Sequence, residues 1–339
     1  MSLVSGSSIL TDKLGRKLQD LRISVTDRCN FRCKYCMPRE IFDKNWQFLE
    51  KNAMLSFEEI LEVVDSFVIF GLKKIRLTGG EPLLRKDLEV LIHMIKSKYP
   101  KLKIALTTNG SLLKLKSLKL KNSGLDRITI SLDSLDPLLF QIMNDTKIPL
   151  AQILEGINHA IKSKISQIKI NCVVKKGVNE NQIIPLIEYF KDKNVTLRFI
   201  EFMDVGNSNN WDLNHVLTRD EILRIINEKY NFSELGREKI SDVAEQFFDT
   251  KRNQKIEIIS SISKPFCSNC TRARLSSEGK LYTCLFGFQG FDLKRILREG
   301  GNLVNEIKFI WNGRDDRFSE LRTEHLNGPR KIEMSYIGG

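Results

Sequence analysis

The sequence LRISVTDRCNFRCKYC, residues 21–36, joins a short β-branched run to three closely spaced cysteines. The run LRISVTD, residues 21–27, predicts a β-strand. Cys29, Cys33 and Cys36 follow in a loop just past the strand end, with C-x3-C-x2-C spacing. Three thiolates this close together can hold three irons of a cubane iron–sulfur cluster. No fourth cysteine lies nearby, so the spacing leaves one iron open to a small-molecule ligand.

Two other interpretations of this loop stay open. One is a zinc site whose fourth ligand lies far along the chain, and the other is a set of reduced structural thiols. Zinc sites usually combine two pairs of ligands, and none of the four histidines lies near this loop. The spacing therefore favours the iron–sulfur interpretation.

Further strand patterns follow along the chain, and a helical pattern separates each from the next. They are KIRLTG (74–79), KIALTTN (103–109), RITISLD (127–133), IKINCVV (168–174) and TLRFIEF (196–202). Ser56 with Glu59, and Thr218 with Glu221, form capping boxes that predict helix starts. Six strand–helix units in succession predict a parallel α/β sheet with functional side chains at the carboxyl ends of its strands. The pattern leaves open whether the sheet is flat or curled into a barrel.

The pattern changes after about residue 235, where short strand signals surround three further cysteines. These signals are KIEIISSI (255–262), ARLSS (273–277) and LYTCLF (281–286). We therefore expect a flexible leader over residues 1–15, a β/α domain over 16–235 and a smaller extension over 236–339.

The second cysteine set is Cys267, Cys270 and Cys284, with C-x2-C-x13-C spacing. A zinc ribbon would need a fourth Cys or His soon after Cys284, and Leu285-Phe286-Gly287 supplies none. The set therefore predicts a second cluster with an open iron. The seventh cysteine, Cys172, has no partner at such a spacing, so we expect it in the core.

Two arginines, Arg272 and Arg274, lie between the ligands of this second set. At positions i and i+2 of a strand they share one face, and their guanidinium groups suit phosphate oxygens. A solvated strand face is the alternative. The net charge of +12 favours an anionic partner, although such a charge alone fits solubility equally well.

Composition narrows the class of protein further. The basic residues are spread along the chain without a compact arm, which disfavours nucleic acid as a partner. No apolar run approaches the length of a membrane span, and the N-terminus lacks the pattern of a secretory signal. There are seven cysteines, an odd number, and a reducing compartment argues against a disulfide framework and for metal binding or catalysis. We therefore expect a cytoplasmic protein with no membrane partner.

The motif Gly79-Gly80-Glu81-Pro82 follows the second strand, and its glycines permit close approach of a ligand to the backbone. Together with C-x3-C-x-aromatic-C, in which Tyr35 is the aromatic residue, it resembles the radical S-adenosylmethionine (SAM) superfamily. That resemblance implies that SAM chelates the open iron and is cleaved to a 5'-deoxyadenosyl radical. It implies SAM contacts at four positions: Tyr35, Gly80, Ser131 and Met203. Taken singly, Ser131 equally fits a helix cap and Met203 a core position.

The two cysteine motifs, the Arg-Ala-Arg segment and a terminal Gly-Gly together resemble the GTP 3',8-cyclase family of molybdenum cofactor biosynthesis, from about Arg16 to Gly339. The resemblance implies a partly closed (β/α)6 barrel with a C-terminal auxiliary-cluster extension over its mouth. It implies two 4Fe–4S clusters, with GTP between them and guanine on the second. The radical would remove hydrogen from ribose C3', and C3' would then attack C8 of guanine. The implied GTP contacts are Arg22, Arg76, Thr107, Lys169, Arg198, Arg272, Ala273 and Arg274. A reductant protein such as a flavodoxin or ferredoxin and a downstream cyclic pyranopterin monophosphate synthase are the implied partners; a homodimer is allowed.

The end of the chain carries a further expectation. Ile332, Met334 and Tyr336 alternate with polar residues, a spacing that predicts an extended tail. The resemblance implies that Gly338 and Gly339 enter the site and act with the first cysteine set and the two arginines as catalytic residues. A disordered terminus and a ubiquitin-like tail are the alternatives.

Two other functions fit parts of these patterns. One is a peptide-modifying maturase with an auxiliary cluster, which usually has more cysteines in its extension than the three found here. The other is a zinc-containing nucleic-acid-binding module, for which SAM would not be cleaved.

Overall fold

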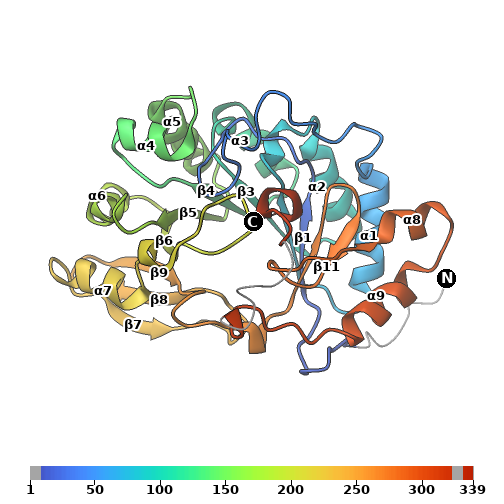
Figure 1. Ribbon diagram of the computed structural model, residues 1–339. Helices are drawn as coiled ribbons and strands as arrows, with labels where there is room; N and C mark the ends of the chain where they lie inside the picture. Colours follow the sequence, from blue (N-terminus) through green and yellow to red (C-terminus); the bar gives the residue numbers. More distant parts are fainter. Residues whose placement is uncertain (1–8, 323–330, 339) are drawn as a thin grey trace.

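The computed structural model describes residues 9–322 and 331–338 and contains the predicted strand–helix units (Figure 1). The strands are β1 (Asp20–Ser24), β2 (Lys74–Thr78), β3 (Lys103–Thr108), β4 (Arg127–Ser131), β5 (Gln167–Val174) and β6 (Thr196–Glu201). The helices are α1 (Phe57–Val68), α2 (Leu88–Lys98), α3 (Leu113–Asn122), α4 (Pro137–Asn144), α5 (Leu150–Lys162), α6 (Ile183–Phe190) and α7 (Arg219–Asn227). The capping boxes predicted ahead of α1 and α7 are both formed, by Ser56 and Thr218.

The rest of the chain extends the same sheet at both edges. Its strands are β7 (Ser233–Gly236), β8 (Glu245–Asp249), β9 (Gln254–Ile259), β10 (Arg272–Leu275), β11 (Lys280–Tyr282) and β12 (Phe291–Asp292). Its helices are α8 (Leu293–Arg298), α9 (Leu303–Asn312) and α10 (Met334–Ile337). The sheet order is β12-β11-β10-β1-β2-β3-β4-β5-β6-β9-β8-β7, with β10 parallel to β1 and β9 parallel to β6. Because β12 and β7 remain as edges, the barrel is only partly closed, as predicted. The boundary at residue 235 stays a prediction.

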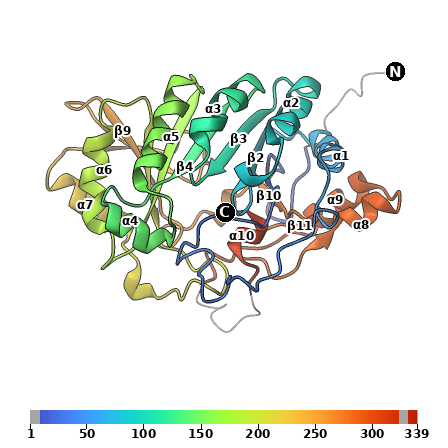
Figure 2. The same ribbon diagram turned by 90° about the horizontal axis from the view of Figure 1, so that it is seen from above.

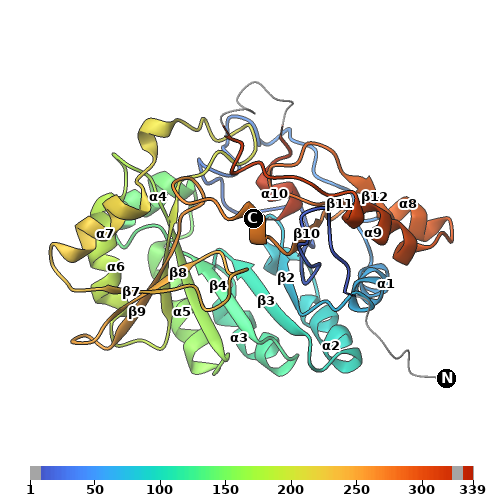
Figure 3. The same cartoon turned by 90° about the horizontal axis from the view of Figure 1, so that it is seen from below.

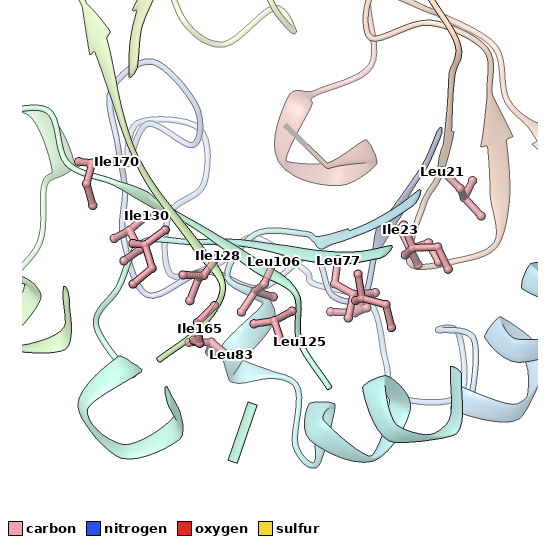
Figure 4. Packing of buried hydrophobic residues seen from close by; sticks show 14 of the residues in the cluster. Leu21, Ile23, Leu77, Leu83, Leu106, Leu125, Ile128, Ile130, Ile165 and Ile170 are labelled. Carbon is pink, nitrogen blue, oxygen red and sulfur yellow. The ribbon is translucent and has the colours of Figure 1, made fainter. Parts of the chain in front are cut away.

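The sheet curves into an arc with most helices on its outer side (Figures 2 and 3). Alternate residues of each strand point to opposite faces. Apolar side chains such as Leu77, Leu106 and Ile128 lie on the face that the helices cover (Figure 4) and are fully buried. Polar residues of the same strands therefore point to the concave side. Cys172 of β5 is buried in this core, as predicted.

The two ends of the described chain are packed. Leu10 and Asp12, inside the predicted leader, are buried. At the other end, α10 lies on the concave side of the arc (Figures 2 and 3). The prediction of an extended tail is wrong at this point, because the Glu333 carbonyl accepts a hydrogen bond from the Tyr336 amide (3.1 Å) and closes a helical turn. No helix in the described ranges is long and apolar enough to span a membrane.

Candidate active site

Both cysteine sets line one cavity of about 290 Å³ on the concave side of the sheet. More than two hundred residues lie between the two sets in the sequence. The curvature of the sheet brings both sets to the same cavity. The other predicted contact residues that line this cavity are Arg22, Tyr35, Arg76, Gly80, Thr107, Ser131, Arg198, Met203, Arg272 and Arg274. Most of the predicted site is therefore assembled around one cavity.

The loop of the first cysteine set is held by Arg32, through its backbone amide and its side chain. The Arg32 amide donates to the carbonyl of Asn144 at the end of α4 (3.0 Å), and the Arg32 guanidinium donates to the Cys29 carbonyl (2.8 Å). Burial raises the pKa of Cys29 to about 12 and the pKa of Cys33 well above its ordinary value. These thiols need a strong positive charge to ionise, and bound iron would supply it.

The Gly79-Gly80-Glu81-Pro82 motif is fastened directly to this loop. The amide of Gly80 donates to the Thr26 carbonyl (2.8 Å), and the amide of Glu81 donates to the Arg28 carbonyl (2.8 Å). A Cβ at Gly80 would lie 2.4 Å from the Arg28 carbonyl oxygen, so only glycine allows this approach. The Glu81 carboxylate accepts hydrogen bonds from the hydroxyl of Thr108 (2.7 Å) and the amide of Asn109 (2.7 Å). The motif thereby fixes the carboxyl ends of β1, β2 and β3 around the first cysteine set.

Tyr35 is fixed across the cavity by a carboxylate that the sequence did not single out. Its hydroxyl donates to Asp133 (2.6 Å), and the other carboxylate oxygen of Asp133 accepts from the Val173 amide (2.8 Å). Burial raises the pKa of Asp133 to about 6. Ser131, at the end of β4, and Met203, just after β6, line the same cavity. The first cysteine set thus faces polar groups suited to a small polar ligand.

The second cysteine set has a different electrostatic environment. The Arg272 guanidinium donates to the Cys270 sulfur (3.4 Å), and the Arg314 guanidinium donates to the Cys270 carbonyl (2.8 Å). Burial alone would raise the pKa of Cys270, but Arg272 and Arg314 outweigh it and lower that pKa to about 6. Burial and Asp316 raise the pKa of Cys284 to about 12. The guanidinium groups of Arg272 and Arg314 therefore favour the anionic form of Cys270.

A buried ion network holds the backbone of this second set. Asp12 accepts from Arg16 (2.5 Å) and from Arg314 (3.3 Å), and all three side chains are almost fully buried. The other end of Arg16 donates to the Cys267 carbonyl (3.0 Å). The residues before β1 are thus part of the support of the second cysteine loop.

Three arginines lie side by side across three strands. Arg274 of β10 is in register with Arg22 of β1, which is in register with Arg76 of β2. Among the described residues none of the three has an ion pair with a carboxylate, and the Nε atoms of Arg22 and Arg76 are buried without a partner. Like charges opposite each other on adjacent strands are destabilising. We call these three residues the arginine row, and its chemistry is that of an anion site.

Two predicted GTP contacts do not line the cavity. Lys169 is bound to Glu257 of β9 (2.6 and 2.9 Å), which also accepts from Arg198. The Ala273 side chain points to the opposite face from its arginine neighbours and belongs to the core. The structure therefore separates these two side chains from the rest of the predicted set.

The C-terminal tail reaches the arginine row. Met334 and Ser335 line the cavity, and the Gly338 carbonyl accepts a hydrogen bond from the Arg274 guanidinium. Gly339 lies outside the described residues.

Sequence reasoning missed Asp133, Asn171 and Arg314, all of which line the cavity. Asp133 had a signal, because it lies just past the end of β4, two residues after Ser131. Asn171 lies within β5 beside Cys172, where only strand alternation places its side chain toward the cavity. Arg314 had none, since the stretch from 287 to 330 carries no recognisable motif and its contact with Cys270 is long-range.

Six of the seven cysteines lie at the cavity in two sets of three. No three Cys, His, Asp or Glu side chains within the described ranges converge as ligands of one ion. All seven thiols are free of disulfides, and three line the cavity at each of two places. Thiolates are soft ligands of the kind that hold iron–sulfur clusters.

Comparison with known proteins agrees with this geometry. Residues 23–190 match the family described as Radical SAM superfamily, and residues 195–320 match Molybdenum Cofactor Synthesis C. A GTP 3',8-cyclase of Staphylococcus saprophyticus is 47% identical over 97% of this chain and 99% of its own length. The chain belongs to the GTP 3',8-cyclase family. A relative of the same name in Staphylococcus carnosus is 48% identical, also over 97% of this chain and 99% of its own length. As in the superfamily at large, membership implies SAM and a 4Fe–4S cluster as cofactors.

Solved structures share the fold of this cyclase-family chain. Streptococcus suis SuiB bound to S-adenosylmethionine has a TM-score of 0.61 at 14% identity, over 91% of this chain and 66% of that longer one. A structure of anSMEcpe with bound AdoMet has a TM-score of 0.54 at 18% identity, over 85% and 79% of the two chains. These likenesses confirm the partly closed barrel.

Proposed function

We propose that this chain converts GTP to (8S)-3',8-cyclo-7,8-dihydroguanosine 5'-triphosphate, the first step of molybdopterin cofactor biosynthesis. The observation that carries the proposal is one cavity lined by two three-cysteine sets and by the arginine row. A nucleoside triphosphate combines an anionic end, which the row suits, with a base that can reach a second metal cluster. The full-length identity to named GTP 3',8-cyclases supports the same substrate.

SAM and GTP would bind at opposite ends of the cavity. Cys29, Cys33 and Cys36 would hold the first cluster, and SAM bound there supplies the radical chemistry. Tyr35, Gly80, Ser131 and Met203 would bind SAM around the open iron. The backbone contacts of Gly80 and the Tyr35–Asp133 hydrogen bond support this assignment, because they fix both sides of that position.

Cys267, Cys270 and Cys284 would hold a second 4Fe–4S cluster, with guanine on its open iron. The arginine row with Arg272 would bind the triphosphate, supported by Thr107 and Arg198 from the neighbouring strands. Lys169 would join only after rotating from Glu257, while Ala273 would contribute backbone atoms alone. Gly338 and Gly339 would complete the site beside Arg274.

The proposed function also indicates where the protein would act and which partner proteins it would need. Free cysteines throughout favour a reducing cytoplasm. Reduction of the first cluster calls for an electron-donor protein such as a flavodoxin or ferredoxin, and the product would pass to a cyclic pyranopterin monophosphate synthase. A homodimer is compatible with all of these assignments.

Anaerobic turnover tests the proposal. Reconstituted enzyme with GTP, SAM and dithionite should give the cyclised triphosphate by mass spectrometry, with about eight irons per chain. Replacing Cys29, Cys33 and Cys36 by Ala should abolish 5'-deoxyadenosine formation. Replacing the second cysteine set by Ala should leave some reductive SAM cleavage but no cyclised product. Stoichiometric zinc, or cleavage that needs only the second set, would contradict the assignment.

A further inference from the structure

The loop that follows β6 carries polar groups aimed at the C-terminal tail. We propose that Asp204, Asn207 and Ser208, with Gly206 between them, form a seat that positions the tail beside Arg274. These are positioning residues, and the inference rests on the proposed function, in which the tail completes the site. We call residues 204–208 the tail seat.

The first half of the seat binds Lys331. Its ammonium donates to the Asp204 carboxylate (2.8 Å) and to the Asp204 carbonyl (2.9 Å). The Asn207 side chain accepts from the Lys331 amide (3.2 Å) and donates to the Lys331 carbonyl, so it pairs with the tail as a strand neighbour would. Asp204 is nearly buried, with a side chain 12% exposed, and it also accepts from Arg322 (3.0 Å). The seat thus anchors the tail two residues before Glu333.

The second half of the seat binds the Glu333 carboxylate. It accepts from the Asn207 amide (3.0 Å) and from the Ser208 hydroxyl (2.7 Å), one bond to each oxygen. Gly206 has φ +68°, and a Cβ there would lie 2.3 Å from Glu333 Oε2. A side chain at position 206 would therefore occupy the place of the carboxylate. The missing side chain at Gly206 and the two hydrogen bonds both place the Glu333 carboxylate in the seat.

Fixing Glu333 fixes the end of the chain. Its carbonyl accepts from the amides of Tyr336 (3.1 Å) and Ile337 (3.4 Å), so Glu333 starts the single turn of α10. Ile337 is fully buried at the end of that turn, and Gly338 follows it to Arg274. A turn this short has little stability of its own. Its position depends on its two ends, the seat at Glu333 and the contact at Gly338.

The seat touches the loop of the first cysteine set, and the tail that it holds touches the loop of the second. The Ser208 hydroxyl lies 3.5 Å from the Cys36 carbonyl, and Asn209 donates to the carbonyl of Met203 (2.9 Å), which lines the cavity. In the tail, the Ile332 amide donates to the carbonyl of Gly287 (3.2 Å). Gly287 follows Cys284 by three residues. The tail therefore takes its final position only when these loops are in place.

Hydrogen–deuterium exchange of the full-length, cluster-loaded protein tests the seat. In Asn207→Ala/Ser208→Ala and in Gly206→Ala, amides 334–338 should exchange about ten-fold faster or more, the factor for losing a hydrogen bond to a charged group. Ser163→Ala is the matched serine control, because its hydroxyl bonds a backbone carbonyl far from the tail (2.8 Å). Gly177→Ala is the matched glycine control, since it shares a positive φ of +74° with nothing within 4 Å. Iron content should be unchanged in all four variants.

A second pair of variants separates the negative charge of the Glu333 side chain from its size. Glu333→Gln keeps a carbonyl acceptor and should loosen the tail less than Glu333→Ala. Unchanged exchange over 334–338 in Glu333→Ala and in both seat variants would overturn the inference, even if GTP is cyclised. Fast exchange in the variants of a protein that makes no cyclised product would keep the seat and overturn the proposed function instead.

Discussion

Replacing Arg22 with Met should make the ligand-free enzyme more stable and the triphosphate-bound enzyme less so. Arg22 is the middle member of the arginine row, with Arg274 and Arg76 in register on either side. Burial and the nearby Arg272 lower the pKa of Arg22 to about 10, the direction expected for a poorly compensated positive charge. Its buried Nε has no partner in the described ranges, so Met forfeits no hydrogen bond at that atom.

The size of the effect follows from strand spacing. Neighbouring strands lie roughly 4.8 Å apart, and at an effective dielectric constant of about 20 two charges roughly 6 Å apart repel by about 3 kcal/mol. The side chains splay and water screens part of this repulsion, so we expect a net gain of about 1–2 kcal/mol. For a chain of this size that gain raises Tm by about 1–3 °C.

Anaerobic thermal unfolding with and without inorganic triphosphate is the assay. A bound ligand stabilises by RT ln(1 + [L]/Kd), so a ten-fold weaker Kd removes about 1.4 kcal/mol of the ligand-induced stabilisation at saturation. Arg295→Met is the control, because Arg295 is a surface residue whose side chain, within residues 9–322 and 331–338, pairs only with Glu299 (3.8 Å). Neither the Tm nor the triphosphate effect should change in this variant. A purely structural arginine would give the opposite pattern. A lower Tm in Arg22→Met, together with the same triphosphate-induced rise in Tm as in the wild type, would therefore refute the reasoning.

Other changes test other parts of the site. Gly80→Ala should displace the first cysteine loop and lower iron content by about half, because its Cβ would lie 2.4 Å from a backbone oxygen, whereas Gly313→Ala meets only ordinary contacts and should keep its iron. Glu257→Gln should lower Tm by several degrees, since two buried cations lose their carboxylate partner. Those cations outweigh burial and lower the pKa of Glu257 from 4.5 to about 2. The ionised Glu257 carboxylate therefore stabilises the fold above pH 4.5, and this stabilisation is lost as the pH falls toward 2. In the Tm–pH profile, Glu257→Gln should lack the fall in Tm that this loss causes. Deleting Gly338 and Gly339 should abolish the cyclised product in the mass-spectrometric assay while iron content stays constant, because the carbonyl that accepts from the arginine row is removed.

The local parts of the site were predictable from sequence. Both cysteine sets, the glycine motif and the capping boxes depend on residues a few positions apart, and such spacings survive any tertiary arrangement. The arginines at positions 272 and 274 were predicted to share a strand face, and β10 places both on the cavity.

The long-range parts were not predictable. Nothing in the pattern of residues 9–16 indicates that Asp12 joins Arg16 and Arg314 behind Cys270, because a buried ion network has no sequence spacing. The helical turn of α10 was missed for a related reason. Alternation favours an extended tail, but the Glu333 contacts with the seat start a turn that the local pattern does not encode.

The way in which the extension joins the barrel explains why a two-cluster cavity can be built accurately. Separate domains usually meet through side chains across an interface that allows relative motion. Here β10 and β9 continue the parallel ladder of β1 and β6, so the extension is joined by backbone hydrogen bonds at two edges. The register places Arg274 beside Arg22 and Glu257 beside Arg198. The relative positions of the two cysteine sets are thereby set by the register of one continuous sheet. Under the proposed function, this register would hold the substrate at a fixed distance from the first cysteine set.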